Sequence, residues 1–263
     1  MRRALRFAAA IVLVSSAPVA AQTRPAPKTA PKTAPKPKPV PFERVYLSLN
    51  GMFQTAGSDF EDRLTYRENA EDAQVDTDYS LKSGPGLDVA GGFVVVRGLG
   101  IGIGVTHFSQ SSGGEIAASI PHPFFFNQSR SITGDVAGLK REELAVHLQV
   151  RGIFPIGRHM QVMMFGGPSF YKVEQGLVSS VRYTDSYPYD VAQFDSAVTA
   201  SVEESKIGAN LGGDFGYFFT RQVGVGIGAQ YMRANLDLPS ADGDTVKVKA
   251  GGFQVVGGLR LRF

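Results

Sequence analysis

The chain contains no cysteine among its 263 residues. This absence excludes disulfide bonds, thiol catalysis and metal sites built from thiolates. A lipoprotein anchor is not expected either, because it needs a cysteine after the signal-peptide cleavage site. The chain also lacks any run of roughly twenty apolar residues that could cross a membrane as a helix. A membrane location would therefore require a closed β-barrel, because only closure satisfies every backbone group in lipid.

Basic and then apolar residues begin the chain. Three arginines in the first six residues precede the apolar stretch 8–14, and small residues follow at 19–21. This order is typical of a secretory signal peptide, which we expect over residues 1–21. Without those three arginines, the 27 basic residues fall to 24, equal to the 24 acidic residues. The mature chain is then formally neutral, and nucleic-acid binding has no support.

Proline and basic residues dominate the next segment. Residues 22–41 hold seven prolines and five basic residues but no acidic one. This composition predicts an extended, disordered periplasmic arm over residues 22–42, with no core of its own. The simplest role for the arm is that of a spacer. The alternative is docking of its cations onto anionic cell-wall polymer or membrane.

The last residues alternate strictly between two kinds of side chain. One face carries Phe253, Val255, Leu259, Leu261 and Phe263 with a glycine, and the other carries Gln254, Arg260 and Arg262. Alternation that ends on an aromatic residue resembles the insertion signal of bacterial outer-membrane β-barrels, whose side chains alternate between lipid and lumen. The resemblance implies the barrel-assembly machinery as a partner during insertion.

The same alternation recurs from residue 44 onward. Besides the C-terminal strand, it predicts strands at 44–55, 83–97, 99–110, 142–154, 160–174, 204–219 and 222–236. Pro168 leaves the phase of one strand open and implies a bulge or a lost ladder bond. Short turns at 97–98, 155–159 and 220–221 alternate with long connections at 56–82, 111–141, 175–203 and 237–246. This arrangement is typical of eight antiparallel strands with both ends in the periplasm.

Together these features resemble the small bacterial outer-membrane β-barrels of the outer-membrane protein A or opacity-protein class. The resemblance covers residues 43–263 and implies an all-β fold, an eight-stranded antiparallel transmembrane up-and-down barrel. It also implies a location in the outer membrane of a Gram-negative-type bacterium, with lipid and lipopolysaccharide as partners. Function does not follow, because such barrels include adhesins, stabilisers, enzymes and narrow channels.

Polar side chains are expected to fill the lumen, because an eight-stranded barrel is just wide enough for its own side chains. The predicted polar network comprises Asp88, Glu143, His147, Arg151, Asp214, Arg260 and Arg262. We expect Asp214 to bridge Arg151 and Arg260, with glycines on facing strands making room for the guanidinium groups. Such a network would plug the lumen. The alternative is a narrow, water-filled channel for small solutes lined by the same residues.

Apolar and aromatic residues are concentrated in two of the long connections. The set comprises Pro121, His122, Pro123, Phe124, Phe125, Phe126, Tyr183, Tyr187 and Tyr189. Large apolar residues in exposed loops usually mark an interaction surface, here for a partner, a glycan or lipid. Equally, the strands could extend beyond the membrane and these loops pack over the barrel mouth. The acidic segment 56–78 is expected to be a solvated loop, with divalent-cation binding as the alternative.

A catalytic role is not expected. His107 and Ser109 share one face of a predicted strand and are faintly similar to the His-X-Ser arrangement of outer-membrane lipid A deacylases. The resemblance implies a general base and a nucleophile acting on an outer-leaflet ester. However, Gln110 stands where that family has asparagine, and the sequence identifies no orienting carboxylate. No histidine pair has metal-ligand spacing, and no phosphate-binding loop occurs, so no cofactor is expected.

The sequence therefore predicts a non-enzymatic barrel that serves envelope structure or surface interaction through its extracellular loops.

Overall fold

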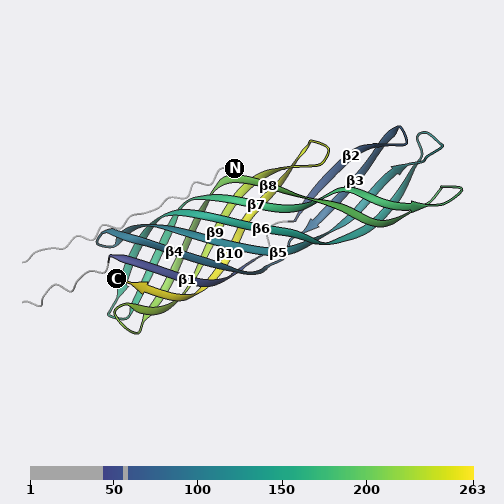
Figure 1. Ribbon diagram of the computed structural model, residues 1–263. Helices are drawn as coiled ribbons and strands as arrows, with labels where there is room; N and C mark the ends of the chain where they lie inside the picture. The colour runs from purple at the N-terminus through teal and green to yellow at the C-terminus, as the bar shows by residue number, and fades with distance from the viewer. Residues whose placement is uncertain (1–43, 56–58) are drawn as a thin grey trace, which may run out of the picture. The chain divides into compact units, whose positions relative to one another are not determined.

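The computed structural model describes residues 44–55 and 59–263, so the expected signal peptide and arm lie outside the described residues. Eight strands form the barrel: β1 (Val45–Gln54), β4 (Gly84–Val96), β5 (Leu99–Pro121), β6 (Ser129–Ile156), β7 (Met160–Asp185), β8 (Ala192–Phe218), β9 (Val223–Pro239) and β10 (Thr245–Arg262) (Figure 1). Neighbouring strands pair antiparallel in this order, and β1 pairs with β10 to close the ring. The predicted eight-stranded up-and-down barrel is confirmed. Over the same residues, the structure holds no helix long and apolar enough to span a membrane.

The barrel strands on one side of the molecule are much longer than a membrane requires. β5, β6, β7 and β8 contain 23, 28, 26 and 27 residues, whereas about ten tilted residues cross the hydrocarbon. The connections expected at 111–141 and 175–203 are therefore mostly strand, and 122–128 and 186–191 are the residues that join the strands. The strands thus continue through these segments, and the aromatic residues of the two connections lie at the far end of the extension.

The first long connection also folds, because it carries its own alternating pattern. β2 (Phe60–Glu68) and β3 (Glu71–Ser80) form a hairpin, and β3 pairs with the distal half of β5. The expectation of a simple solvated loop is therefore wrong. Acidic residues line the outer face of this hairpin, and Arg63 pairs with Asp76 at 2.6 Å.

The interior changes character along the barrel. Within the membrane part, apolar side chains such as Leu47, Ile103, Leu148 and Ile227 point outward and are exposed. Beyond it the polarity reverses, and apolar side chains fill the interior between the hairpin and the extended strands. This upper core includes Phe60, Leu64, Val75, Tyr79, Ile116, Ile120, Ile132, Leu177, Val178, Leu238 and Val248. Each large apolar side chain buried there contributes about 1.5–3 kcal/mol, so the extension is a packed structure and not a set of mobile loops.

The phase left open in β7 is resolved by the pairing of β7 with β6. His147 lies opposite Ser169 and Val150 opposite Gly166, and the ladder is interrupted between them at Gly167 and Pro168. The register is the same on both sides of the gap. Pro168 therefore causes lost ladder bonds and no bulge.

Candidate functional site

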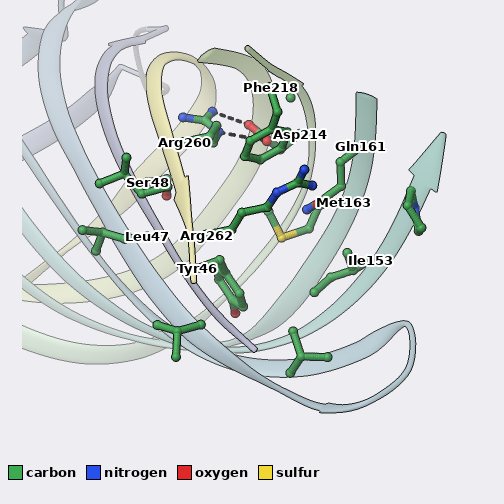
Figure 2. Close-up of a pocket in the computed structure, with 15 residues that line it drawn as sticks. Tyr46, Leu47, Ser48, Ile153, Gln161, Met163, Asp214, Phe218, Arg260 and Arg262 are labelled. Atoms are coloured by element: carbon green, nitrogen blue, oxygen red, sulfur yellow. Dashed lines mark hydrogen bonds and ion pairs between the residues drawn. The ribbon is translucent and has the colours of Figure 1, made fainter. Parts of the chain in front are cut away.

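An ion pair lies inside the lumen, over β9, near the end of the barrel that carries the short turns. The Arg260 Nε donates to Asp214 Oδ1 at 3.0 Å, and its Nη2 donates to the second oxygen of the same carboxylate. Figure 2 shows the two side chains facing each other. Arg260 also donates to Asn50, whose amide donates to Asp88 at 2.6 Å. Four strands are thereby linked through buried polar groups.

Arg151 does not join this ion pair, so the predicted bridge from Asp214 to both arginines is wrong. Its Nη2 donates to Gln149 Oε1 at 2.6 Å, and its guanidinium carbon lies 4.7 Å from the Tyr46 ring centroid and 5.4 Å from that of Phe165. Aromatic faces attract a desolvated guanidinium. Arg151 is therefore held by two aromatic rings and the neutral Gln149 amide, and not by the Asp214 carboxylate.

Glycines leave the space that both guanidinium groups occupy. A Cβ added at Gly102 would lie 2.9 Å from Arg151 Nε, and one at Gly226 would lie 2.7 Å from Arg260 Nε. Real Cβ atoms do not approach other heavy atoms so closely. The glycine rows thus permit the two arginines to enter a lumen that side chains otherwise fill.

A second buried ion pair lies toward the opposite end of the lumen. Glu143 contacts Arg141 at 2.6 Å and accepts a hydrogen bond from the Gly251 amide at 2.9 Å. Arg141 also donates to Gln175 at 3.0 Å. Glu143 therefore belongs to a separate pair, above the Arg260 group rather than within it.

His147 links polar side chains of three adjacent strands on the lumen side of the barrel. Its two ring nitrogens lie 3.1 Å from Thr106 Oγ1 and 2.8 Å from Ser169 Oγ. Asn210 donates to the same serine at 2.8 Å and accepts from Gln149 at 2.9 Å. This chain of hydrogen bonds leads to Arg151, so the lumen contains linked polar groups at several depths.

Little empty space remains beside these groups. The cavity lined by Asp88, Arg151, Asp214 and Arg260 measures about 20 Å³, which is room for about one water.

A larger hollow of about 150 Å³ lies at the short-turn mouth (Figure 2). Arg262 lines this hollow, half-buried, with its guanidinium carbon 3.8 Å from the Phe218 ring centroid. Its place is thus the mouth and not the inner network to which the sequence assigned it.

The C-terminal apolar face points away from the lumen. Phe253, Val255, Leu259 and Phe263 are exposed on the outer wall, and Leu261 is half-buried there. The strand that carries them pairs with β1 and closes the barrel.

Aromatic side chains form an exposed cluster at the far end of the extension, which we call the aromatic apex. Phe124, Phe125, Phe126 and Tyr187 are 56–86% exposed, and Tyr183 and Tyr189 are half-buried. Phe124 lies edge-on to Tyr189 with centroids 5.4 Å apart. The predicted interaction surface needs one correction, since Pro121 and His122 are buried beneath this cluster.

Arg130 ties together the two segments that carry the apex. Its Nη2 donates to the Pro121 carbonyl at 3.1 Å, and its Nη1 donates to Asp185 at 2.5 Å and to the Tyr189 carbonyl at 3.3 Å. Arg130 is 5% exposed. A buried, charge-assisted contact of this kind holds the connections 122–128 and 186–191 in one arrangement.

His122 orders the first of these connections from below. Its Nδ1 accepts hydrogen bonds from the amides of Phe124 at 3.1 Å and Phe125 at 3.2 Å. The ring proton therefore lies on Nε2, which is 3.7 Å from the Asp190 carboxylate of the other connection. The buried histidine thus presents the phenylalanines outward.

The tip of the β2–β3 hairpin completes the apex. Asn69 donates to the Pro121 carbonyl at 3.2 Å, and Glu71 accepts from the Asn127 amide at 2.8 Å. Asn69 and Asn127 both have positive φ, at 50° and 58°, a conformation that asparagine tolerates. Three connections far apart in sequence therefore meet at one surface.

Sequence reasoning missed the residues that build this surface. Arg130 and Asp185 carry no local signal, because 55 positions separate them and each alone is an ordinary charged residue. Asn69 and Glu71 were assigned to a solvated loop. Pairing of the extended strands brings them together, and that pairing was not expected.

One further group faces outward, just above the apolar band. His107 Nε2 lies 3.1 Å from Glu142 Oε1, and Ser109 is opposite Glu142 in the β5–β6 register. Lys140 also contacts this carboxylate, at 2.8 Å. Among the described residues, no group of three or more histidine, aspartate or glutamate side chains gathers as a metal site.

The membrane part has the architecture that lipid requires, because a closed ring of strands carries apolar groups outside and hydrogen-bonded polar groups inside. The chain has the fold of a small transmembrane β-barrel. No family model matches it, and no curated protein matches it. Three solved structures that resemble it are the outer membrane protein OprG from Pseudomonas aeruginosa, Neisserial surface protein A and the outer membrane protease OmpT from Escherichia coli. Each is 10% identical, with 84%, 83% and 84% of this chain and 96%, 97% and 97% of the other chain covered, at TM-scores of 0.49, 0.42 and 0.46. These similarities assign no activity.

Proposed function

We propose that the protein is a non-enzymatic, non-conducting barrel that presents its aromatic apex to a partner outside the cell. The observation that carries this proposal is the Arg130 contact with Pro121 and Asp185. A buried charge is costly to hold in place, and here it orders a surface whose aromatic side chains remain exposed. Exposed rigid aromatic groups are typical of interaction surfaces, because they bury large areas at low entropic cost.

A groove beside the apex supports the same role. It has a volume of about 770 Å³, and its lining includes Glu68, Asn69, Phe124, Tyr183 and Asp195. Aromatic faces beside carboxylate and amide groups suit a ligand that offers both apolar surface and hydrogen-bond donors.

Attachment of cells that display the chain tests this proposal. Wild-type cells are compared with the variant Phe124→Ser/Phe126→Ser/Tyr187→Ser on immobilised mucin, collagen and lipopolysaccharide. Lys247→Ser/Lys249→Ser is the matched control, because these exposed lysines lie on β10 away from the apex. We expect a several-fold loss of binding to at least one probe in the apex variant alone. If the apex variant binds as wild type does, and detergent sensitivity rises only in cells lacking the chain, envelope structure is the role.

We further propose that residues 22–42 lie in the periplasm, since an even number of strands places both ends of the barrel on the short-turn side. On this orientation, lipopolysaccharide surrounds the extended strands. The assembly machinery and, through the basic arm, the cell wall are further partners that we propose.

The His107–Glu142 contact favours a second candidate, a lipid A-modifying esterase. Ser109 would be the nucleophile, His107 the general base and Glu142 the group that orients the base. Mass spectrometry of lipid A from cells expressing wild type or Ser109→Ala tests this candidate. Loss of an acyl chain that depends on Ser109 would support it, and unchanged lipid A would dismiss it.

A further inference from the structure

The extension that carries the aromatic apex is strongly acidic. Residues 59–82, 113–137 and 178–200 hold eight, two and three acidic residues, 13 in all, against three, one and one basic residues, five in all. The rest of residues 43–263 holds 11 acidic and 14 basic residues. The excess of negative charge is therefore concentrated at one end of the molecule.

Two carboxylates line the groove beside the apex without a basic partner. Glu68 accepts a hydrogen bond from the Tyr183 hydroxyl at 3.3 Å, and Asp195 accepts one from the Thr184 hydroxyl. Within the described part of the chain, no lysine or arginine pairs with either carboxylate. Because both partners are neutral hydroxyls, the two negative charges remain uncompensated.

The arginines near the apex leave the groove acidic. Arg67 donates to the Ala70 carbonyl at 2.6 Å, and Arg130 is buried in its ion pair with Asp185. That pair is neutral as a whole, although Asp185 also lines the groove. Arg182 is exposed and lines the groove as well. It offsets one of the two uncompensated carboxylates and not both.

Further carboxylates extend the negative charge over the connections that form the apex. Glu71 accepts a hydrogen bond from the Asn127 amide at 2.8 Å. Asp190 lies 3.7 Å from Nε2 of His122, which is neutral because its Nδ1 accepts two amide hydrogen bonds. Neither contact supplies a full positive charge. A ligand in the groove therefore meets a negative potential from several sides.

The apex already holds one cation of its own between an aromatic ring and a carboxylate. The guanidinium carbon of Arg130 lies 5.4 Å from the Tyr183 ring centroid, and the same group pairs with Asp185. The groove offers the same two kinds of group to a ligand, because Phe124 and Tyr189 line it beside the two uncompensated carboxylates. Ring faces and carboxylates both attract lysine and arginine side chains.

We propose that this groove binds a lysine- or arginine-rich segment of a partner protein. The inference rests on the proposed role of the apex as an interaction surface, and it names the chemistry of the partner. A basic side chain lays its apolar stem along the aromatic rings and places its charged head beside Glu68 or Asp195. Attraction between the acidic extension and the basic segment also speeds their encounter, and added salt weakens it.

Fluorescence anisotropy of a labelled peptide tests this proposal on the full mature chain in phosphatidylcholine discs, whose lipid has no net charge. The probe alternates lysine with glycine, and the reference peptide has glutamine in place of each lysine. Wild type should bind the lysine peptide more tightly. Glu68→Gln/Asp195→Asn should weaken this binding by about five-fold, as expected for two exposed ion pairs. The amides keep the oxygens that accept from Tyr183 and Thr184, so the local hydrogen bonds remain.

Glu115→Gln/Asp135→Asn is the matched control, because it removes the same charge. These exposed residues lie opposite each other in the β5–β6 ladder and do not line the groove. The control should bind the lysine peptide as wild type does. Arg182→Gln should bind it about two-fold more tightly, because one repulsive charge is lost. This variant also provides the test if Glu68→Gln/Asp195→Asn does not fold.

Equal binding of the two peptides by wild type would overturn the inference. So would unchanged binding in the groove variants, or an equal loss in the matched control. If the aromatic variant still loses attachment to mucin, collagen or lipopolysaccharide, the apex keeps its proposed role and binds another class of ligand. If attachment is also unchanged, the proposed role itself fails.

Discussion

The Arg260 guanidinium donates hydrogen bonds to both carboxylate oxygens of Asp214, joining β10 to β8 over the intervening strand β9. The Arg260 and Asp214 side chains are 6% and 9% exposed. Water therefore competes little for either charge.

Replacement of Asp214 by asparagine should lower the stability of the barrel. The change leaves a buried guanidinium without its counter-charge, at a cost of about 3–5 kcal/mol. Urea titration of the refolded protein, followed by circular dichroism, measures the midpoint. The double variant Asp214→Asn/Arg260→Met should regain part of the loss, because it removes the unpaired charge. An unchanged midpoint for Asp214→Asn would contradict a stabilising role for this ion pair.

The refolded wild-type protein should carry no steady current in a planar bilayer. The residual cavity of about 20 Å³ beside Arg260 and Arg151 has no room for a continuous water column. Replacement of both arginines by alanine should permit brief openings, because two large side chains leave the lumen. Steady conductance by the wild type would instead favour the water-filled channel.

Replacement of Arg130 by glutamine should loosen the aromatic apex without unfolding the barrel. The variant loses the charge-assisted contact to Asp185, so residues 122–128 and 186–191 become accessible to protease. Limited proteolysis followed by mass mapping checks this expectation. Arg182→Gln is the control, since that side chain is exposed. Cleavage at the same rate in both variants would show that Arg130 does not hold the apex.

The stability of the β2–β3 hairpin should depend on the protonation of Asp62. Burial raises the pKa of this carboxyl, and a hydrogen bond from the Ser240 hydroxyl at 3.2 Å opposes the rise. A raised folded-state pKa means that the folded protein binds the proton more tightly than the unfolded chain does. Stability should therefore fall as pH rises from the ordinary aspartate value through the raised value.

Asp62→Asn should remove this slope and stabilise the protein at neutral pH. Thermal melting followed by circular dichroism between about pH 4 and about pH 7 measures it. Asp78→Asn, at an exposed site on the same hairpin, should retain the wild-type slope. An equal slope in wild type and Asp62→Asn would assign the pH dependence to other groups.

The membrane part of the fold could be predicted from sequence because each barrel strand encodes its two faces with a period of two. For example, Leu148 faces the lipid and the next residue, Gln149, faces the lumen. The extension escaped prediction because its polarity is reversed and its strands are rich in glycine, serine and threonine. Ile116 and Ile132 cannot be recognised as core residues from the sequence, because they are buried only when the extended parts of β5 and β6 pair.

The same distinction holds for the sites. The depth and phase of Asp214 and Arg260 follow from counting along two strands. The partners of Arg151 do not, because Tyr46 meets it through the curvature of the closed barrel, and Phe165 lies opposite it in a strand whose phase the sequence left open. Likewise, contacts such as Arg130 with Asp185 depend on the exact register of strands that were expected to be loops.

The unequal strand lengths determine how far the molecule reaches. β7 and β8 have 26 and 27 residues, and about ten suffice for the bilayer, so about 50 Å of strand stands outside it. In the orientation proposed above, this length is a stalk that lifts the aromatic apex away from the sugars and phosphates of the outer leaflet. On the proposed role, a partner as broad as another cell surface would meet the apex first, without having to penetrate that layer.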